Sequence, residues 1–186
     1  MLNKTERQQL SDIARQSIET GLQQGQPLNP DLLNFAARLQ QPGASFVTLE
    51  KNRQLRGCIG SLEAYQPLAQ DVAQNAYAAA FRDPRFPPLG QKEMTAVEIH
   101  ISVLSQPEAM HISSEADLLA QLRPGKDGLI FESGSHRGTF LPSVWEQLPR
   151  ASEFVRHLKL KAGLPAEGWP ADMRVSRYET ESFAAT

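Results

Sequence analysis

Apolar residues recur at helical spacing in several parts of the chain. Over residues 5–22, leucine and isoleucine fall on one face, and Thr5 and Gln8 occupy the positions of a capping box. Asn29 in a capping position and Pro30 at the first helical position predict a second, shorter helix, which ends near residue 40. The same reasoning predicts helices over residues 67–81, 113–122, 142–148 and 152–162.

Alternation of apolar and polar positions predicts strands. The clearest case is residues 96–104, where β-branched side chains occupy one face and Glu98, His100 and Ser102 the other. Residues 173–183 have a similar composition and predict a last strand near the end of the chain.

Two further segments predict β-hairpins. Residues 44–62 hold two extended runs around a polar tetrad at 51–54, which places Cys58 on the second strand of the first hairpin. Residues 127–142 predict a second hairpin that turns at 133–136. Because hairpins dominate and the βαβ repeat of a parallel sheet is missing, we expect an α+β fold with antiparallel sheets.

Length and composition narrow the class of protein. The 186 residues are 40% hydrophobic and 22% charged, which is typical of a folded globular protein in one domain with two lobes or in two small domains. The formal net charge of -2 gives no basic excess, so no nucleic acid is expected as a partner. No apolar run has the length of a signal peptide core or a membrane helix, which predicts a cytoplasmic protein without membrane attachment.

The single cysteine, Cys58, lies in the hexapeptide "LRGCIG". One thiol excludes an internal disulfide, a CxxC pair and a multi-thiolate zinc site. Base rates favour a packing role, because free cysteine is among the most buried residue types. Gly57 and Gly60 indicate instead a bulge or a place where a ligand or another backbone approaches closely, and Arg56 could favour a thiolate.

A nucleophilic thiol needs a base, and His100 is the first candidate. It lies between Glu98 and Ser102 on the polar side of its strand, where a carboxylate could orient the imidazole; the alternative is a solvated outer face of the sheet. His136, in a polar turn, is a second candidate. Glu98 and His100 supply two metal ligands at most, so no metal site is predicted.

Four arginines flank glycine or proline turns, where guanidinium groups and backbone donors can surround an anion. The alternative is that each is solvated or pairs with a carboxylate such as Asp83 or Glu98. The four candidates are Arg56, Arg82, Arg85 and Arg137.

Five motifs together resemble one protein family. They are "LRGCIG", "AFRDPRFPPL", "EIHISVLS", "DGLIFESGSHRGTFLPSVW" and "FVRHLKLKAGLP". On these motifs the chain is identified as a member of the AMMECR-one domain family, whose bacterial and archaeal members are called AmmeMemoRadiSam system protein A. The resemblance extends over nearly the whole chain, residues 1–186, and the hexapeptide is matched in full.

The resemblance implies a single domain of two unequal subdomains, a larger one from both chain ends and a smaller one from an internal segment, with a cleft between them. The side chains of residues 55–60 are expected to line or support that cleft. The family name implies association with a Memo-like protein and a radical SAM enzyme. The family supplies no established activity, no cofactor and no catalytic residues.

Two hypotheses of function follow. In the first, the cleft binds a substrate, with Cys58 as nucleophile and His100 or His136 as base. Arg56, Arg82 or Arg85 then holds an anionic group. In the second, the protein is a non-catalytic accessory module that binds the Memo-like protein or the radical SAM enzyme. Delivery of a bound metal or cofactor, resting on Glu98 and His100, is a third reading.

Overall fold

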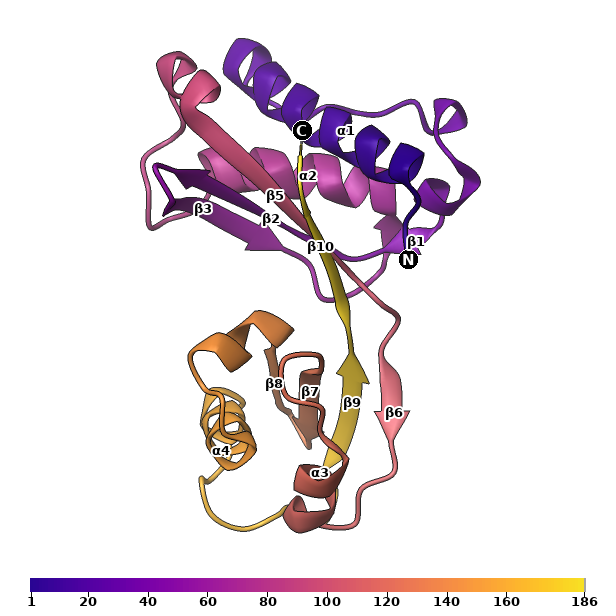
Figure 1. Ribbon diagram of the computed structural model, residues 1–186, viewed down its shortest axis with the longest axis vertical. Helices are drawn as coiled ribbons and strands as arrows, with labels where there is room; N and C mark the ends of the chain where they lie inside the picture. The colour runs from indigo at the N-terminus through magenta and orange to yellow at the C-terminus, as the bar shows by residue number, and fades with distance from the viewer. Residues whose placement is uncertain (186) are drawn as a thin grey trace. The chain divides into compact units, whose positions relative to one another are not determined.

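The chain folds into two compact units, each with its own sheet and core. In the computed structural model, which describes residues 1–185, the first unit comprises Met1–Leu104 together with the chain from Glu181 onward, and the second comprises Ser105–Thr180 (Figure 1). The chain therefore passes from one unit to the other twice. Helices and antiparallel sheets make up both units, which confirms the predicted α+β fold.

The first unit is built on a four-stranded antiparallel sheet in the order β10-β5-β2-β3. The predicted hairpin of β2 and β3 is confirmed, and it turns at Asn52 and Arg53, whose φ angles are 53° and 61°. Positive φ at both turn positions is what a two-residue hairpin loop requires. The strands are β2 (Ser45–Lys51), β3 (Gln54–Gly60), β5 (Val97–Leu104) and β10 (Thr180–Ala184).

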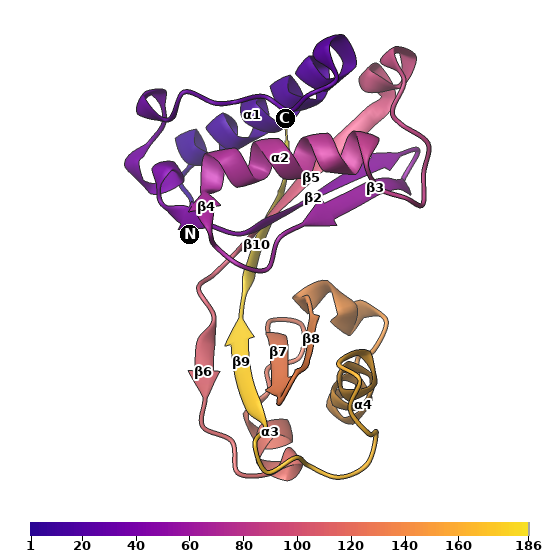
Figure 2. The same cartoon turned by 180° about the vertical axis from the view of Figure 1, so that it is seen from behind.

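Two helices, α1 (Lys4–Gln24) and α2 (Leu68–Phe81), cover one face of this sheet (Figure 2). The alternate residues Val47, Leu49 and Ile101 are fully buried beneath them. Helix α2 is rich in alanine, and its small side chains let its backbone approach the sheet closely. A short ladder of β1 (Pro42–Gly43) with β4 (Gln66–Pro67) and a 3₁₀ turn at Gln91–Ala96 complete the unit.

Two predictions for the N-terminal region are wrong in detail. The first helix begins earlier, and its capping box is formed by Asn3 and Glu6, not by Thr5 and Gln8. The second predicted helix is replaced by two 3₁₀ turns, at Leu32–Asn34 and Ala37–Gln40. The Gln9 side chain accepts a hydrogen bond from the backbone amide of Ala36 at 3.2 Å. Because this amide is bonded to α1 and not to a carbonyl of its own segment, a continuous helix is interrupted there.

The second unit contains another four-stranded antiparallel sheet, in the order β6-β9-β7-β8. The predicted hairpin of β7 and β8 is confirmed, with register Ser133↔His136 at its turn. Phe131, Phe154 and Trp145 lie in the core of the unit. Its elements are β6 (Glu108–Met110), α3 (Glu115–Gln121), β7 (Gly128–Ser133), β8 (His136–Phe140), α4 (Ala151–Lys161) and β9 (Arg174–Tyr178), with a 3₁₀ turn at Pro142–Glu146.

The last predicted strand, residues 173–183, is two strands. Glu179 separates β9 from β10, and the two strands join different sheets in different units. The buried residues of β9, Val175 and Tyr178, are three positions apart, and the sequence pattern of this segment does not show that the strand changes sheets. In residues 1–185, no helix combines the length and the apolar character needed to span a membrane.

Candidate functional site

Cys58, Thr48 and His100 lie side by side across three neighbouring strands of the first unit. Thr48 of β2 is paired with Cys58 of β3 on one side and with His100 of β5 on the other. Residues directly opposite each other in a sheet share a face, so the three side chains form a row. The Thr48 hydroxyl donates a hydrogen bond to Sγ of Cys58 at 3.2 Å.

This row lies on the face of the sheet that α1 and α2 do not cover, because its members alternate with the buried residues of the same strands. We call it the outer face and define it by Thr48, Glu50, Cys58, Glu98 and His100. Cys58 and Thr48 are half-buried, so both are accessible in part. The predicted imidazole and thiol are thus on one face, but two strand spacings, roughly 10 Å, separate their backbones.

A buried carboxylate anchors the strand that carries Cys58. Oδ2 of Asp83 accepts the amide of Cys58 at 2.9 Å, and the same carboxylate accepts two hydrogen bonds from the Arg85 guanidinium, at 2.6 and 2.9 Å. Arg85 in turn donates to the carbonyl of Cys58 at 3.3 Å. The hydrogen bonds from Arg85 and Cys58 hold the pKa of Asp83 well below its usual range. Arg85 is therefore fixed beside the cysteine, while its side chain stays 54% exposed.

Arg56 is engaged by a different carboxylate. Glu93 accepts two hydrogen bonds from Arg56, at 3.0 and 3.2 Å, and one from Lys51 at 2.9 Å. These donors lower the pKa of Glu93 to about 2. The ring of Phe86 lies 6.0 Å from the Arg56 guanidinium and 5.5 Å from that of Arg85, so both arginines flank one aromatic ring.

The other two predicted arginines lie elsewhere. Arg82 ends α2 with its guanidinium 5.2 Å from the ring of Tyr77. Arg137 belongs to the second unit, where its Nε is 3.4 Å from Glu132. His136, the second candidate base, is in the same hairpin of the second unit. The structure thus brings only Arg56 and Arg85 together, and each is paired with a carboxylate.

The two glycines of the hexapeptide lie against other parts of the same protein chain, which leave no space for a side chain. A Cβ on Gly57 would lie 2.1 Å from the carbonyl oxygen of Ala79, because α2 crosses the strand there. A Cβ on Gly60 would lie 2.3 Å from the ring of Phe46. The sequence allowed either a bulge or the close approach of a ligand or another backbone at these glycines. At Gly57 another backbone approaches closely, and at Gly60 a side chain does.

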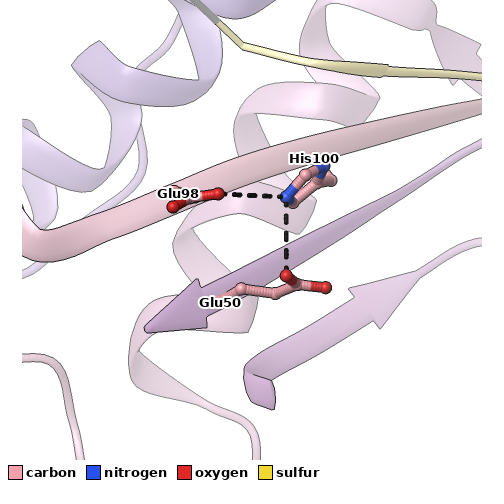
Figure 3. Close-up of side chains that lie close together, drawn as sticks. All are labelled: Glu50, Glu98 and His100. Carbon is pink, nitrogen blue, oxygen red and sulfur yellow. Dashed lines mark ion pairs between the residues drawn. The ribbon is translucent and has the colours of Figure 1, made fainter. Parts of the chain in front are cut away.

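A group of three side chains on the outer face has the composition of a metal site (Figure 3). His100 Nε2 is 3.7 Å from a carboxylate oxygen of Glu50 and 3.9 Å from one of Glu98, and all three atoms lie within 4.8 Å of one another. The sequence indicates Glu98 and His100 but not Glu50. Glu50 is on the neighbouring strand, directly opposite Glu98, so only the strand register reveals it.

A second buried carboxylate, missed by the sequence reasoning, lies close to the end of the hexapeptide strand. Asp71, on the first turn of α2, is fully buried and accepts hydrogen bonds from four side chains. No cation is among these donors. They are Ser45 at 2.6 Å, Ser61 at 2.5 Å, Asn75 at 2.9 Å and Gln66 at 3.2 Å. Asp71 thereby ties the start of α2 to the chain leaving β3.

The second unit has a polar hollow of about 270 Å³. Its charged side chains pair with one another, Arg123 with Glu179 at 2.8 Å and Arg177 with Glu108 at 3.7 Å. A ligand would have to compete with these pairs, and no residue predicted from the sequence lines the hollow. We therefore regard the outer face of the first unit as the better candidate. The lining residues are Ser105, Glu108, Arg123, Arg177, Tyr178 and Glu179.

The chain is similar to known proteins over nearly its whole length. It is 40% identical over 189 residues to a protein of Methanothermobacter thermautotrophicus, covering 98% of this chain and 95% of that protein. It is 38% identical over 138 residues to the protein MJ0810 of Methanocaldococcus jannaschii, covering 71% of this chain and 67% of that protein.

Among solved structures, the crystal structure of the uncharacterised protein PH0010 from Pyrococcus horikoshii superimposes with a TM-score of 0.85 at 32% identity, covering 97% of this chain and 92% of that one. It has the same fold. A family model described as AMMECR1 matches residues 11–183. These matches confirm the resemblance read from the motifs, and the chain belongs to the AMMECR1 family.

Proposed function

We infer that this protein binds a small-molecule substrate or ligand on the outer face of the first unit, at the strand that carries "LRGCIG". The observation that supports this is the row of Cys58, Thr48 and His100, which sets a thiol, a hydroxyl and an imidazole side by side on the face opposite α1 and α2. Arg85, held beside Cys58 and half exposed, is the group that would meet an anionic part of the ligand.

The geometry favours a contact role for Cys58 over a thiol activated by His100. A general base must come within hydrogen-bond reach of the proton that it removes, about 3 Å between heavy atoms. Thr48 lies between the thiol and the imidazole and is itself the donor to Sγ. Among residues 1–185, the side chain that hydrogen-bonds to the thiol is therefore a hydroxyl and not an imidazole.

Thiol alkylation tests this role. We expect iodoacetamide to modify Cys58 in the native protein, with the same dependence of rate on pH in wild type and in His100→Gln, because the imidazole does not contact the sulfur. A His111→Gln variant, which changes an exposed histidine of the second unit, is the matched control. A thiol that is inert in the native protein, or whose rate profile shifts only in His100→Gln, would contradict the proposal.

Native mass spectrometry tests the ligand. We expect freshly purified wild-type protein to retain a small molecule that is lost from Cys58→Ser and from Thr48→Val. The control is Thr20→Ser, an equally small change on α1 in which the new hydroxyl can keep its bond to the carbonyl of Gln16. A molecule retained equally by all variants would remove Cys58 and Thr48 from the binding site.

A second candidate function is that of a non-catalytic accessory module. It is favoured by the same separation of thiol and imidazole, which leaves the outer face without a nucleophile and base in contact. Here the face would bind the Memo-like protein or the radical SAM enzyme that the family name suggests. Pull-down with each purified protein tests it, with Cys58→Ser as the variant expected to weaken capture; no association with either would count against it.

A further inference from the structure

The two sheets of this protein differ in the charge of the side chains that lie opposite their carboxylates. In the second unit, Glu132 lies directly between Arg137 and Arg174 on the neighbouring strands, and Glu108 is directly opposite Arg177. In the first unit, Glu50 is directly opposite Glu98. Opposite charges across strands stabilise a sheet and like charges destabilise it, so the first sheet carries a pair that stability alone would disfavour.

The side chain next to both of these glutamates is His100. Its Nε2 points between the two carboxylates, at 3.7 Å from Glu50 and 3.9 Å from Glu98 (Figure 3). This nitrogen is covered from solvent, although the imidazole as a whole is 36% exposed, and within residues 1–185 it has no hydrogen-bond partner. A buried polar atom without a partner is uncommon and calls for an explanation such as an ion.

We propose that Glu50, Glu98 and His100 bind a divalent first-row transition metal ion on the outer face of the first unit. One imidazole nitrogen and two carboxylate oxygens are a ligand set of the kind that holds such ions at open sites, where water or a substrate takes the remaining positions. The ion would supply the positive charge that the opposed glutamates lack. This inference does not rest on the proposed ligand site around Cys58.

The observed spacing is wider than a bound ion requires. Ligand atoms at about 2.1 Å from one ion lie about 3.4 Å apart at tetrahedral angles, and no more than about 4.2 Å apart at any angle. The three atoms here lie within 4.8 Å of one another, so the carboxylates must move closer by about 1 Å. Glu98 can do so because its side chain is 70% exposed and free to change rotamer.

The ligand set also predicts selectivity among ions. Imidazole suits zinc, iron, copper and nickel, whereas magnesium and calcium prefer oxygen ligands alone. We therefore expect Zn²⁺ to bind and Mg²⁺ at the same concentration not to compete. Because protons compete with the metal ion for the same ligand atoms, binding should weaken as the pH is lowered.

Calorimetric titration of the chelator-treated full chain with ZnCl₂ at pH 7.5 tests the proposal. We expect one Zn²⁺ per chain and a loss of at least ~10-fold in affinity in Glu50→Gln and in His100→Gln, since even outer partners of a metal site contribute that much. Glu98→Gln, at an exposed position that leaves folding intact, should lose affinity as well. The matched controls are Glu19→Gln and His111→Gln, each an exposed residue outside the site.

Cobalt provides a spectroscopic readout that separates this site from the thiol. Co²⁺ bound to the three side chains should give visible absorption bands that disappear in Glu50→Gln and remain in Cys58→Ser. If the absorption bands persist in Cys58→Ser, they support the metal site even if the proposed ligand site around Cys58 is wrong. The proposal is overturned if Zn²⁺ shows no saturable binding, or if all variants bind equally, which would indicate adventitious binding.

Discussion

The two units place similar sheets in different electrostatic roles. Each sheet has four antiparallel strands and packs one face against the core of its unit. On the other face of the second sheet, the charges that face each other across strands are of opposite sign, as Glu132 with Arg137 and Arg174 illustrates. On the outer face of the first unit, two glutamates oppose each other beside a histidine.

In the second sheet the charges that face each other across strands stabilise the sheet, whereas in the first they do not. Cross-strand pairs of opposite charge stabilise a fold without a ligand, which describes the second unit. The first unit secures its strands by other means, with Asp83 and Glu93 bound to arginines at the edge next to β3. The outer face carries a thiol, an imidazole and two carboxylates beside that imidazole, and groups of these kinds can bind ligands and metals.

The largest expected effect comes from removing the anchor of the hexapeptide strand. Asp83→Ala leaves the amide of Cys58 and the Arg85 guanidinium without their shared acceptor. Because a buried donor without a partner costs the desolvation of that group, we expect the free energy of unfolding to fall by about 2–3 kcal/mol. Urea unfolding followed by circular dichroism measures it.

The second unit offers the matched control for this anchor. Asp172 accepts the hydroxyl of Ser133 and the amide of Gly134, much as Asp83 accepts the amide of Cys58, but its side chain is exposed. Asp172→Ala should therefore cost clearly less than Asp83→Ala. Equal losses in the two variants would show that burial is not what makes the first anchor strong.

An intermediate effect, dependent on pH, is expected for Glu93. Its pKa falls to about 2 in the folded chain from an ordinary value of 4.5, so its bonds to Arg56 and Lys51 stabilise the fold above about pH 4.5. This contribution is lost as the pH falls from about 4.5 to about 2, because the carboxylate becomes protonated. We expect Glu93→Gln to be less stable than wild type by about 1–2 kcal/mol at pH 7.

Unfolding experiments between pH 7 and pH 2 check this prediction. The stability gap between wild type and Glu93→Gln should narrow as the pH falls through the stated range. A gap that stays constant down to pH 2 would mean that the ionised carboxylate is not what Arg56 and Lys51 recognise.

The smallest expected effect is a change in the free energy of unfolding when one cross-strand glutamate is neutralised. This change should have opposite signs in the two sheets. With chelator present and at pH 8, Glu50→Gln removes one of two like charges and should stabilise the chain by about 0.5 kcal/mol. Glu132→Gln removes a charge that lies between two arginines and should destabilise by a similar amount. If the urea midpoints of the two variants moved in the same direction, the two sheets would not differ in how their cross-strand charges affect stability.

Local patterns predicted most of the elements but not how the last strand is shared. Helices α1, α2 and α4, both hairpins and β5 follow from spacing and turn chemistry, which depend on neighbours in sequence. The division of residues 173–183 between two sheets does not, because the partners of a strand are distant segments of the chain. The predicted start of α1 is wrong because Asn3 and Glu6 match a capping box as well as Thr5 and Gln8 do.

The family, the α+β class and the outward position of His100 on its strand follow from the amino-acid sequence, because they depend on motifs and on a period of two. Three other features are seen only in the folded chain: Glu50 faces Glu98, Thr48 separates Cys58 from the imidazole, and Arg56 and Arg85 are bound to Glu93 and Asp83. Strand register and the packing of distant segments bring these residues together. A single sequence contains no local signal for either.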